Sequence, residues 1–286
     1  MSKQRAQSEP SLNNKRKRTE KGKEKNRPED DEAEAQRPRK LAHGEKLLIS
    51  RGTSCSSLSK PLSPSDITFG VTSGSANHCT VPFFVGKEGH EHVQTPLNYE
   101  FDAPKKLSFG VTTYEGKANT HMAVVSLLKD VPSDAQHLDR NSELEGIIKG
   151  YLISESAVDV WQQVGIEQPK TLEELDKHWV SPVHTWLAKR TKEQFTDIRL
   201  KFNVNFRKVK EYVAKDLRVA DDAKNKDANL DDIPQGTLMR GVYGYRELFV
   251  RPQKTGKLAP YTCGISAYAK DVEFHPNPDD SYVFAD

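Results

Sequence analysis

Nine residues in the second half of the chain have the composition of a binding surface. Residues 199–207 read Arg-Leu-Lys-Phe-Asn-Val-Asn-Phe-Arg, and their apolar and polar side chains alternate without exception. Successive side chains of an extended chain point to opposite faces, so this alternation predicts a strand with one apolar face. The other face holds three cations, two amides and no acid. A face of that kind is either an ordinary solvated strand surface or a surface that lies along a polyanion.

A second basic segment, nearer the C-terminus, has the pattern of a hairpin. We expect one strand from Leu238 to Arg251 and another from Tyr261 to Phe274, joined by a turn that contains two lysines. Simple alternation would place several rings and one arginine of the first strand on a shared face. Cations can follow phosphates while rings accept stacked bases, so both segments suit a single-stranded nucleic acid. The candidate binding residues are Arg199, Lys201, Arg207, Lys208, Tyr243, Tyr245, Arg251, Lys254 and Lys257, with Tyr114 as a further ring.

No residue pattern in the chain predicts catalysis or a cofactor. The sequence contains no phosphate-binding Gly-x4-Gly-Lys loop, no Gly-x-Ser-x-Gly turn and no His-Glu-x2-His motif. His78, Cys79, His90 and His92 lie close in sequence but lack the paired spacing of a zinc site, so we predict no metal ligands. The acid pairs at 221–222 and 231–232 fall in polar loop sequence. They leave a metal-dependent nuclease as an alternative.

Charge is divided unevenly along the chain. Residues 1–40 contain thirteen Lys or Arg and eight Asp or Glu, whereas the remainder carries a net charge of −3. We interpret residues 1–65 as a disordered basic and Ser-rich arm with a linker, because the arm has almost no apolar side chains to bury. The run Lys15-Arg16-Lys17-Arg18 is a nuclear localisation signal, a nucleic-acid-attracting arm or part of a solubilising tail. The three cysteines are odd in number and widely spaced, which indicates an intracellular protein with reduced thiols.

The remaining patterns predict an α+β domain over residues 66–275. Strands are expected around 97–101, 107–114 and 120–128. A helical insertion is expected over about 138–195, beginning with an apolar stripe from Leu144 to Leu152 and including Trp161, Trp179 and Trp186 as core residues. Residues 276–286 form a short acidic and aromatic tail, a candidate contact for replication proteins. No segment is apolar over the length that a membrane helix needs.

Part of the chain also resembles a known protein family. The stretch from Thr95-Pro96-Leu97 to Leu128, with Ala103-Pro104 and Phe109-Gly110-Val111-Thr112-Thr113-Tyr114, resembles the early strands of single-stranded-DNA-binding-like proteins of large DNA viruses of algae and protists. The segment from Trp179 to Trp186 and the hairpin from Met239 to Val272 are similar to that family in order and character. The resemblance spans about residues 95–272 but includes neither the basic arm nor Lys208 to Asp232. It implies an OB-like β-barrel with a helical insertion, and a role in sheltering single strands.

The residues and the resemblance together predict a protein that binds single-stranded DNA without sequence preference and without chemistry, in replication, recombination or repair. The expected location is the nucleus or a viral replication site. DNA and RNA both remain open as ligands. The main alternative is a structural or partner-binding β protein, such as a component of a virion or of a nuclear scaffold. That alternative explains the strands and helices equally well, but it leaves the acid-free cationic face unexplained.

Overall fold

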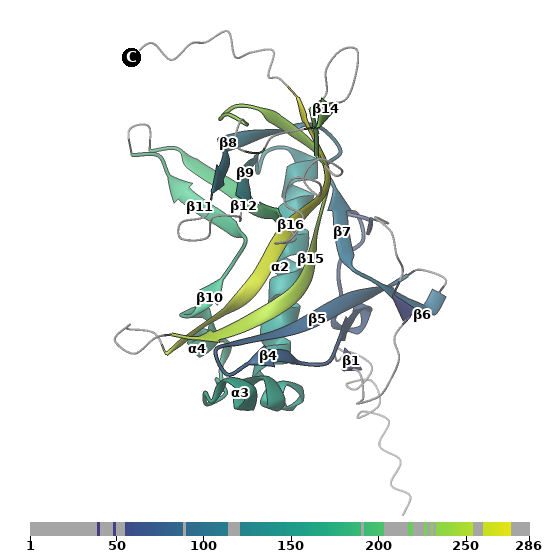
Figure 1. The fold of residues 1–286 in the computed structure, drawn as a ribbon, viewed down its shortest axis with the longest axis vertical. Helices are drawn as coiled ribbons and strands as arrows, with labels where there is room; N and C mark the ends of the chain where they lie inside the picture. Colours follow the sequence, from purple (N-terminus) through teal and green to yellow (C-terminus); the bar gives the residue numbers. More distant parts are fainter. Residues whose placement is uncertain are drawn as a thin grey trace, which may run out of the picture. The chain divides into compact units, whose positions relative to one another are not determined.

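The structure is a computed structural model, and it describes residues 55–87, 90–113, 121–189, 192–202, 230, 233–253 and 260–275, together with the short strands at 39–40, 48–49, 217–219 and 226–227. The described chain is mostly β-sheet with a few helices (Figure 1). The predicted α+β class is therefore confirmed. None of the helices in these residues is both long enough and apolar enough to span a membrane.

The first half of the described chain consists of short strands and one long helix. Its elements are β1 (Arg39–Lys40), β2 (Leu48–Ile49), η1 (Pro64–Asp66), β3 (Ile67–Phe69), β4 (Ser73–Ser75), β5 (His78–Lys87), β6 (His90–Thr95), β7 (Leu97–Glu100), β8 (Lys105–Thr113), β9 (His121–Leu127) and α2 (Pro132–Ile153). The second half ends in two long strands. Its elements are η2 (Glu155–Ala157), α3 (Val158–Val164), α4 (Leu172–Asp176), β10 (Trp179–Val180), β11 (Val183–Leu187), β12 (Gln194–Phe202), β13 (Leu217–Val219), β14 (Lys226–Asp227), β15 (Leu238–Pro252) and β16 (Tyr261–His275).

Five of these strands pair in a closed order. β8 pairs with β9, β9 with β12, β12 with β16, β16 with β15, and β15 returns to β8 through Leu238 and Met239. Only the β12–β16 contact in this circuit is parallel. If β8, β9, β12, β15 and β16 are numbered 1 to 5 in chain order, their order around the circuit is 1-2-3-5-4. β15 also pairs with β5 and β7, and so joins the circuit to the N-terminal strands.

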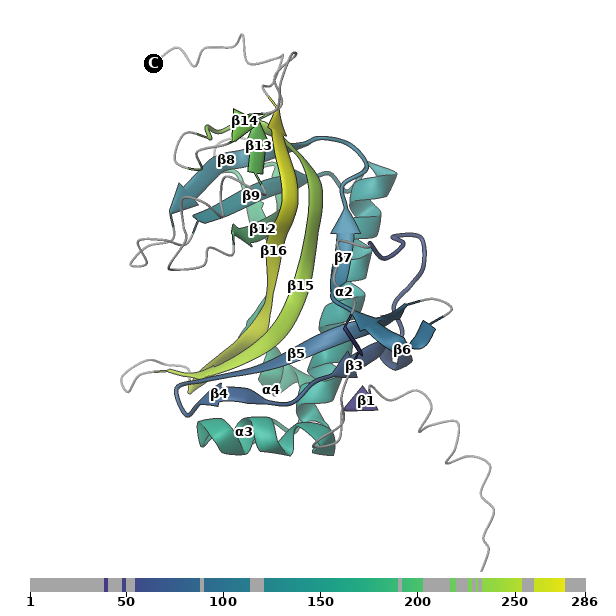
Figure 2. The same ribbon diagram turned by 45° about the vertical axis from the view of Figure 1, so that its right-hand side comes forward.

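Helix α2 covers one face of the β15–β16 hairpin (Figure 2). The apolar stripe predicted from Leu144 to Leu152 is buried, which confirms that part of the sequence interpretation. Two buried hydrogen bonds tie the helix to β15. His137 Nδ1 and Tyr243 Oη lie 2.7 Å apart, and Tyr245 Oη donates to Asn141 Oδ1 at 2.9 Å. The ring of Tyr151 stacks on Phe69 with 3.8 Å between centroids, so the same helix also reaches β3.

The helical region is shorter than the sequence predicts. Helices occupy parts of residues 132–176, but residues 179–180 and 183–187 are strands, and β12 begins at Gln194. The expectation that helices continue to Phe195 is therefore wrong. β10 and β11 extend the sheet because β10 pairs with Cys263 and Gly264 of β16, while β11 pairs with the first half of β12. Trp161 is buried as predicted, whereas Trp179 and Trp186 are only half-buried.

The strands expected from alternation are present. The hairpin predicted at 238–251 and 261–274 corresponds to β15 and β16 within one residue at each end. The strand predicted from Arg199 is confirmed as far as Phe202, where its four described residues alternate in burial. The remainder of that stretch, residues 203–207, lies outside the described residues. The proposed arm and the C-terminal tail also lie outside them, apart from β1, β2 and residues 55–65.

Candidate nucleic-acid interface

The face of the hairpin that points away from α2 carries the exposed cations, and we call it the outer face. Directly paired residues of neighbouring strands share a face. Tyr245 contacts α2 and is paired with Ala267, which is paired in turn with Leu200, so all three lie on the inner face. Their strand neighbours Tyr268 and Lys201 therefore lie together on the outer face, where they are directly paired.

Strand β12 places two of the predicted cations on this outer face. The side chain of Arg199 is exposed, and its apolar neighbours Ile198 and Leu200 are fully buried on the other side. Lys201 is half-buried, and its Nζ donates to Ser266 Oγ at 2.8 Å. This bond fixes the ammonium group above β16. The contact of either residue with nucleic acid stays a prediction.

Two arginines of β15 lie over aromatic rings on the same face. The guanidinium carbon of Arg246 is 5.5 Å from the ring centroid of Tyr268, and that of Arg251 is 4.8 Å from the ring centroid of Phe249. Arg251 also donates from Nε to Nδ1 of His78 at 2.9 Å. A guanidinium over a ring is held at low entropic cost with donors still available for an anion, because it has five N–H groups. The predicted Arg251 thus lies among outer-face groups.

Lys270 borders the outer face but is held more tightly. Its Nζ reaches over Gly244 to the side-chain oxygen of the buried Asn98, which belongs to β7. Burial lowers the pKa of Lys270 to about 8, and the positive charge of Arg246 acts in the same direction. The charge of this ammonium group therefore begins to be lost at mildly alkaline pH.

Tyr243 and Tyr245 do not lie on the outer face, and their predicted role under nucleic-acid bases is wrong for this structure. Both side chains are fully buried, and burial raises their pKa well above the ordinary value. The physical reason is a β-bulge. Tyr245 pairs with Ala267 but Leu248 pairs with Ile265, so β15 has one more residue than β16 between these two pairs. The extra residue reverses the alternation, and Phe249 points outward although Tyr245 points inward.

The other predicted site residues cannot be located. Tyr114, Arg207, Lys208, Lys254, Lys257 and the signal Lys15-Arg16-Lys17-Arg18 all lie outside the described residues. The described part of the interface therefore consists of a smaller set than the sequence proposed. Its members are Arg199, Lys201, Arg246, Arg251 and Tyr268, while Phe249 is only 8% exposed and lies beneath Arg251.

Three further rings were not assigned to the interface from the sequence. Trp186 stacks on Phe195 with 4.9 Å between centroids and 21° between planes, and Phe109 lies 5.7 Å from Trp186. Phe109 is 51% exposed. Phe195 alternates with Arg199 and Lys201 on β12, and this alternation extends the pattern noticed from residue 199 toward the N-terminus. The signal was present in the sequence, but a helix was expected there.

The predicted absence of metal ligands concerns residues that are only partly described. Within the described ranges, no group of three or more His, Cys, Asp or Glu side chains is placed to hold a metal ion. His78 and Cys79 point to opposite sides of β5. Cys79 is buried, with its Sγ 3.6 Å from Gln163 Oε1, and burial raises the pKa of its thiol to about 11.

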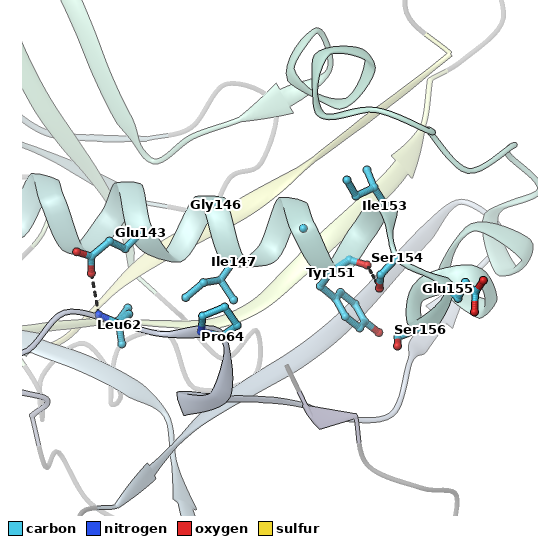
Figure 3. Close-up of a pocket in the computed structure, with 11 residues that line it drawn as sticks. Leu62, Pro64, Glu143, Gly146, Ile147, Tyr151, Ile153, Ser154, Glu155 and Ser156 are labelled. Atoms are coloured by element: carbon cyan, nitrogen blue, oxygen red, sulfur yellow. Dashed lines mark hydrogen bonds between the residues drawn. The ribbon is translucent and has the colours of Figure 1, made fainter. Parts of the chain in front are cut away.

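A separate hollow lies along α2, away from the outer face (Figure 3). It has a volume of about 930 Å³ and is lined by one side of the helix, η2 and the segment around Leu62 and Pro64. Glu143 accepts a hydrogen bond from the backbone amide of Leu62 at 2.8 Å, which closes one end of the hollow. Among the predicted site residues that the structure describes, none lines this hollow.

Comparisons with known proteins add little information about this interface. No family model and no curated protein sequence matches the chain. Among solved structures, gp2.5, a single-stranded DNA-binding protein encoded by bacteriophage T7, is similar over 67% of this chain and 90% of its own. The two are 12% identical, with a TM-score of 0.36. A likeness of that degree carries no information about function.

Proposed function

We propose that this protein binds single-stranded DNA without sequence preference, along the outer face, in replication, recombination or repair. The observation that carries the proposal is the gathering of Arg199, Lys201, Arg246 and Arg251 on one face, two of them over aromatic rings. The chain beyond residue 40 has a net charge of −3, so these cations are a local feature rather than a general one. A positive surface with interleaved rings is what a single strand requires.

The order of strand pairing supports an OB-like barrel as the framework of this face. An OB fold is a five-stranded, partly open Greek-key barrel that binds oligonucleotides on the face of its second and third strands. In the closed circuit described above, the second and third strands are β9 and β12, and β12 carries Arg199 and Lys201. The loop between the fourth and fifth strands also contributes to binding in OB folds. Here the corresponding segment of sequence contains Lys254 and Lys257.

The proposal is that of a binding protein without catalysis, acting in the nucleus or at a viral replication site. Sheltering a strand needs affinity and exchange but no reacting group. Incubation with labelled DNA and Mg²⁺ or Mn²⁺ should therefore leave the DNA intact, and a metal-dependent nuclease would cleave it.

A salt titration tests the outer face directly. Affinity for oligothymidylate should fall as salt rises, with a logarithmic slope of about −0.7 for each phosphate neutralised. Replacing Arg199 and Lys201 together by Gln should make the slope shallower by more than about one unit. The matched control is Lys170→Gln with Lys177→Gln, which removes the same charge from exposed positions beside α4. An unchanged slope in the first variant would remove the outer face from the proposal.

The basic arm must be separated from the folded surface in the same experiment. Replacing Lys15-Arg16-Lys17-Arg18 by Gln alters only the sequence outside the described residues. If the outer face binds the strand, this variant keeps the wild-type sensitivity to the Arg199 and Lys201 replacements. If the arm alone binds the strand, the variant loses the salt dependence and the outer-face replacements have no further effect.

A further inference from the structure

We propose that Phe109, Trp186 and Phe195 form a stacking site for unpaired bases at the β11–β12 hairpin. This inference rests on the proposed function, and it adds a place where bases rather than phosphates are held. The three rings come from β8, β11 and β12 and form a row with Trp186 between the two phenyl rings. β11 lies outside the five-stranded circuit, so this site is an addition to the sheet rather than part of the circuit.

The row of rings ends at an exposed position. The side chain of Phe109 is 51% exposed, so one end of the row is open to a ligand. A base laid against Phe109 would continue the row, because offset stacking at this spacing is the favoured arrangement of aromatic rings.

The backbone of β8 is shaped to turn Phe109 outward. Regular alternation would place Phe109 on the same side as Leu107, which is fully buried. Instead, β8 has two more residues than β9 between the pairs Leu107–Val125 and Val111–Ala123. Gly110 lies within this irregularity and has φ of +71°. A side chain at Gly110 would come within 2.7 Å of the backbone of Ile233. The exposure of Phe109 is therefore built into the strand and is not a frayed end.

A buried carboxylate holds the indole ring in place. Asp197 is 2% exposed and accepts hydrogen bonds from Trp186 Nε1 at 2.5 Å and from Ser108 Oγ at 2.7 Å. The indole N–H is the only polar group of tryptophan, so this bond leaves Trp186 without a donor for reading a base edge. The ring can then contribute stacking alone, which every base accepts. Asp197 is thus a positioning residue, and the site it supports does not discriminate between sequences.

The position of the rings beside cations favours nucleic acid over a protein partner. Phe195, Asp197, Arg199 and Lys201 lie on the same side of β12, because they occupy alternate positions. Phe195 and Arg199 are four residues apart, or roughly 13 Å along the strand. A single strand whose phosphates follow Arg199 and Lys201 could therefore place a nearby base against the rings. Since bases inside a duplex are covered by their neighbours, the site would accept only unpaired ones.

Two oligonucleotides separate stacking from phosphate binding. One is oligothymidylate, and the other has the same length and backbone but abasic sugars. In the full-length protein, Phe109→Leu should weaken oligothymidylate binding about 5-fold to 150-fold, the equivalent of about 1–3 kcal/mol for one stacked base. Binding of the abasic strand and the salt slope should remain at the wild-type values. Fluorescence anisotropy at fixed salt measures both affinities.

Further variants protect the test against a change in folding. Phe109 is exposed, so Phe109→Leu should keep the wild-type unfolding midpoint in urea. Trp186→Leu should also weaken oligothymidylate binding selectively, while Trp186→Phe, which keeps a ring, should restore most of the affinity. Leu172→Ala is the control for an exposed apolar residue elsewhere, since Leu172 on α4 is 48% exposed. It should change neither affinity.

Each contrary result has a distinct meaning. If the wild-type protein binds neither strand, the proposed function fails and the stacking site fails with it. If the wild type binds both strands and Phe109→Leu binds oligothymidylate normally, the stacking site is wrong but the cationic face stands. If the ring variants lose affinity equally for both strands, the rings only shape the surface, and the inference is overturned.

Discussion

Tyr245 and Tyr268 lie on opposite faces of one hairpin, and the difference between these faces separates folding from binding. On the inner face, Tyr245 is fully buried and donates a hydrogen bond to Asn141 of α2. On the outer face, Tyr268 is half-buried beneath the guanidinium group of Arg246. The same residue type serves two purposes because α2 covers only one side. Composition alone therefore cannot show which rings of a basic strand are available to a ligand.

The largest expected contrast comes from removing one ring on each face. Tyr243→Ala should lower the free energy of unfolding by about 3–5 kcal/mol, because it empties a fully buried site beside Phe101 and His137. Tyr268→Ala should lower it by only about 1 kcal/mol, the scale of one exposed cation–π contact. Urea unfolding measures both values. Equal losses would mean that the two faces do not differ in their contribution to folding.

A group packed against the inner face, His137 of α2, should make the stability of the fold depend on pH. Burial, with the charge of Lys105 nearby, lowers the pKa of His137 to about 4. The unfolded chain then binds a proton at pH values where the folded chain does not, so stability is complete above pH ~6.5 and is lost as pH falls toward 4. The loss attributable to this one group is up to about 3 kcal/mol. His137→Phe should unfold with a smaller loss of stability between pH 6.5 and 4.5. A parallel pH profile in the variant would contradict this assignment.

Two glycine substitutions should have opposite effects. A Cβ atom at Gly244 would lie 2.3 Å from Asn98 Oδ1 and 2.5 Å from the carbonyl oxygen of Leu97, both on β7, which pairs with β15. Gly244→Ala should therefore cost about 1–3 kcal/mol, through forced movement of a packed backbone. Gly146 on α2 has open space at the same position, so Gly146→Ala should stabilise the protein by about 0.5–1 kcal/mol. Thermal unfolding of both variants checks the pair, and destabilisation by both would show that α2 is also crowded at Gly146.

The smallest expected effect on stability is on the outer face. Arg199→Gln should change the free energy of unfolding by no more than about 0.5 kcal/mol, because its side chain is exposed. The same variant should nevertheless reduce the salt dependence of DNA binding. Measuring both quantities on one preparation sharpens the comparison between the faces. A large loss of stability would show that Arg199 supports the fold rather than a ligand.

The sequence predicted which segments are strands better than it predicted which way their side chains point. β15 and β16 are close to their expected ends because period-two patterns are local. The inward position of Tyr243 and Tyr245 depends on the bulge after Tyr245, which exists only in the pairing of two strands. The strands at 179–187 were missed for a related reason. They are short, and β10 is extended because it pairs with β16, a strand that is distant in sequence, while β11 pairs with the beginning of β12.

The cations of the candidate site were partly predictable, and its rings were not. Arg199, Lys201 and Arg251 were recognised from strand patterns and occur on the outer face. Phe109, Trp186 and Phe195 come together only when β8, β11 and β12 are assembled. No local pattern marks three rings that are separated by as many as 86 positions in the chain. The accompanying Asp197 would have been read as an unfavourable charge, because its burial against Trp186 is a tertiary feature.

The bulge between Tyr245 and Leu248 makes the length of β15 as important as its composition. If β15 paired with β16 without this bulge and kept all of its residues, strict alternation would turn Leu248 and Val250 toward solvent and Phe249 and Arg251 toward the core. No single substitution on the strand could exchange so many environments at once. Relatives of this chain should therefore tolerate a one-residue gap at Arg246 or Glu247 more readily than a gap elsewhere on β15, because only the first leaves the facing of the other residues unchanged.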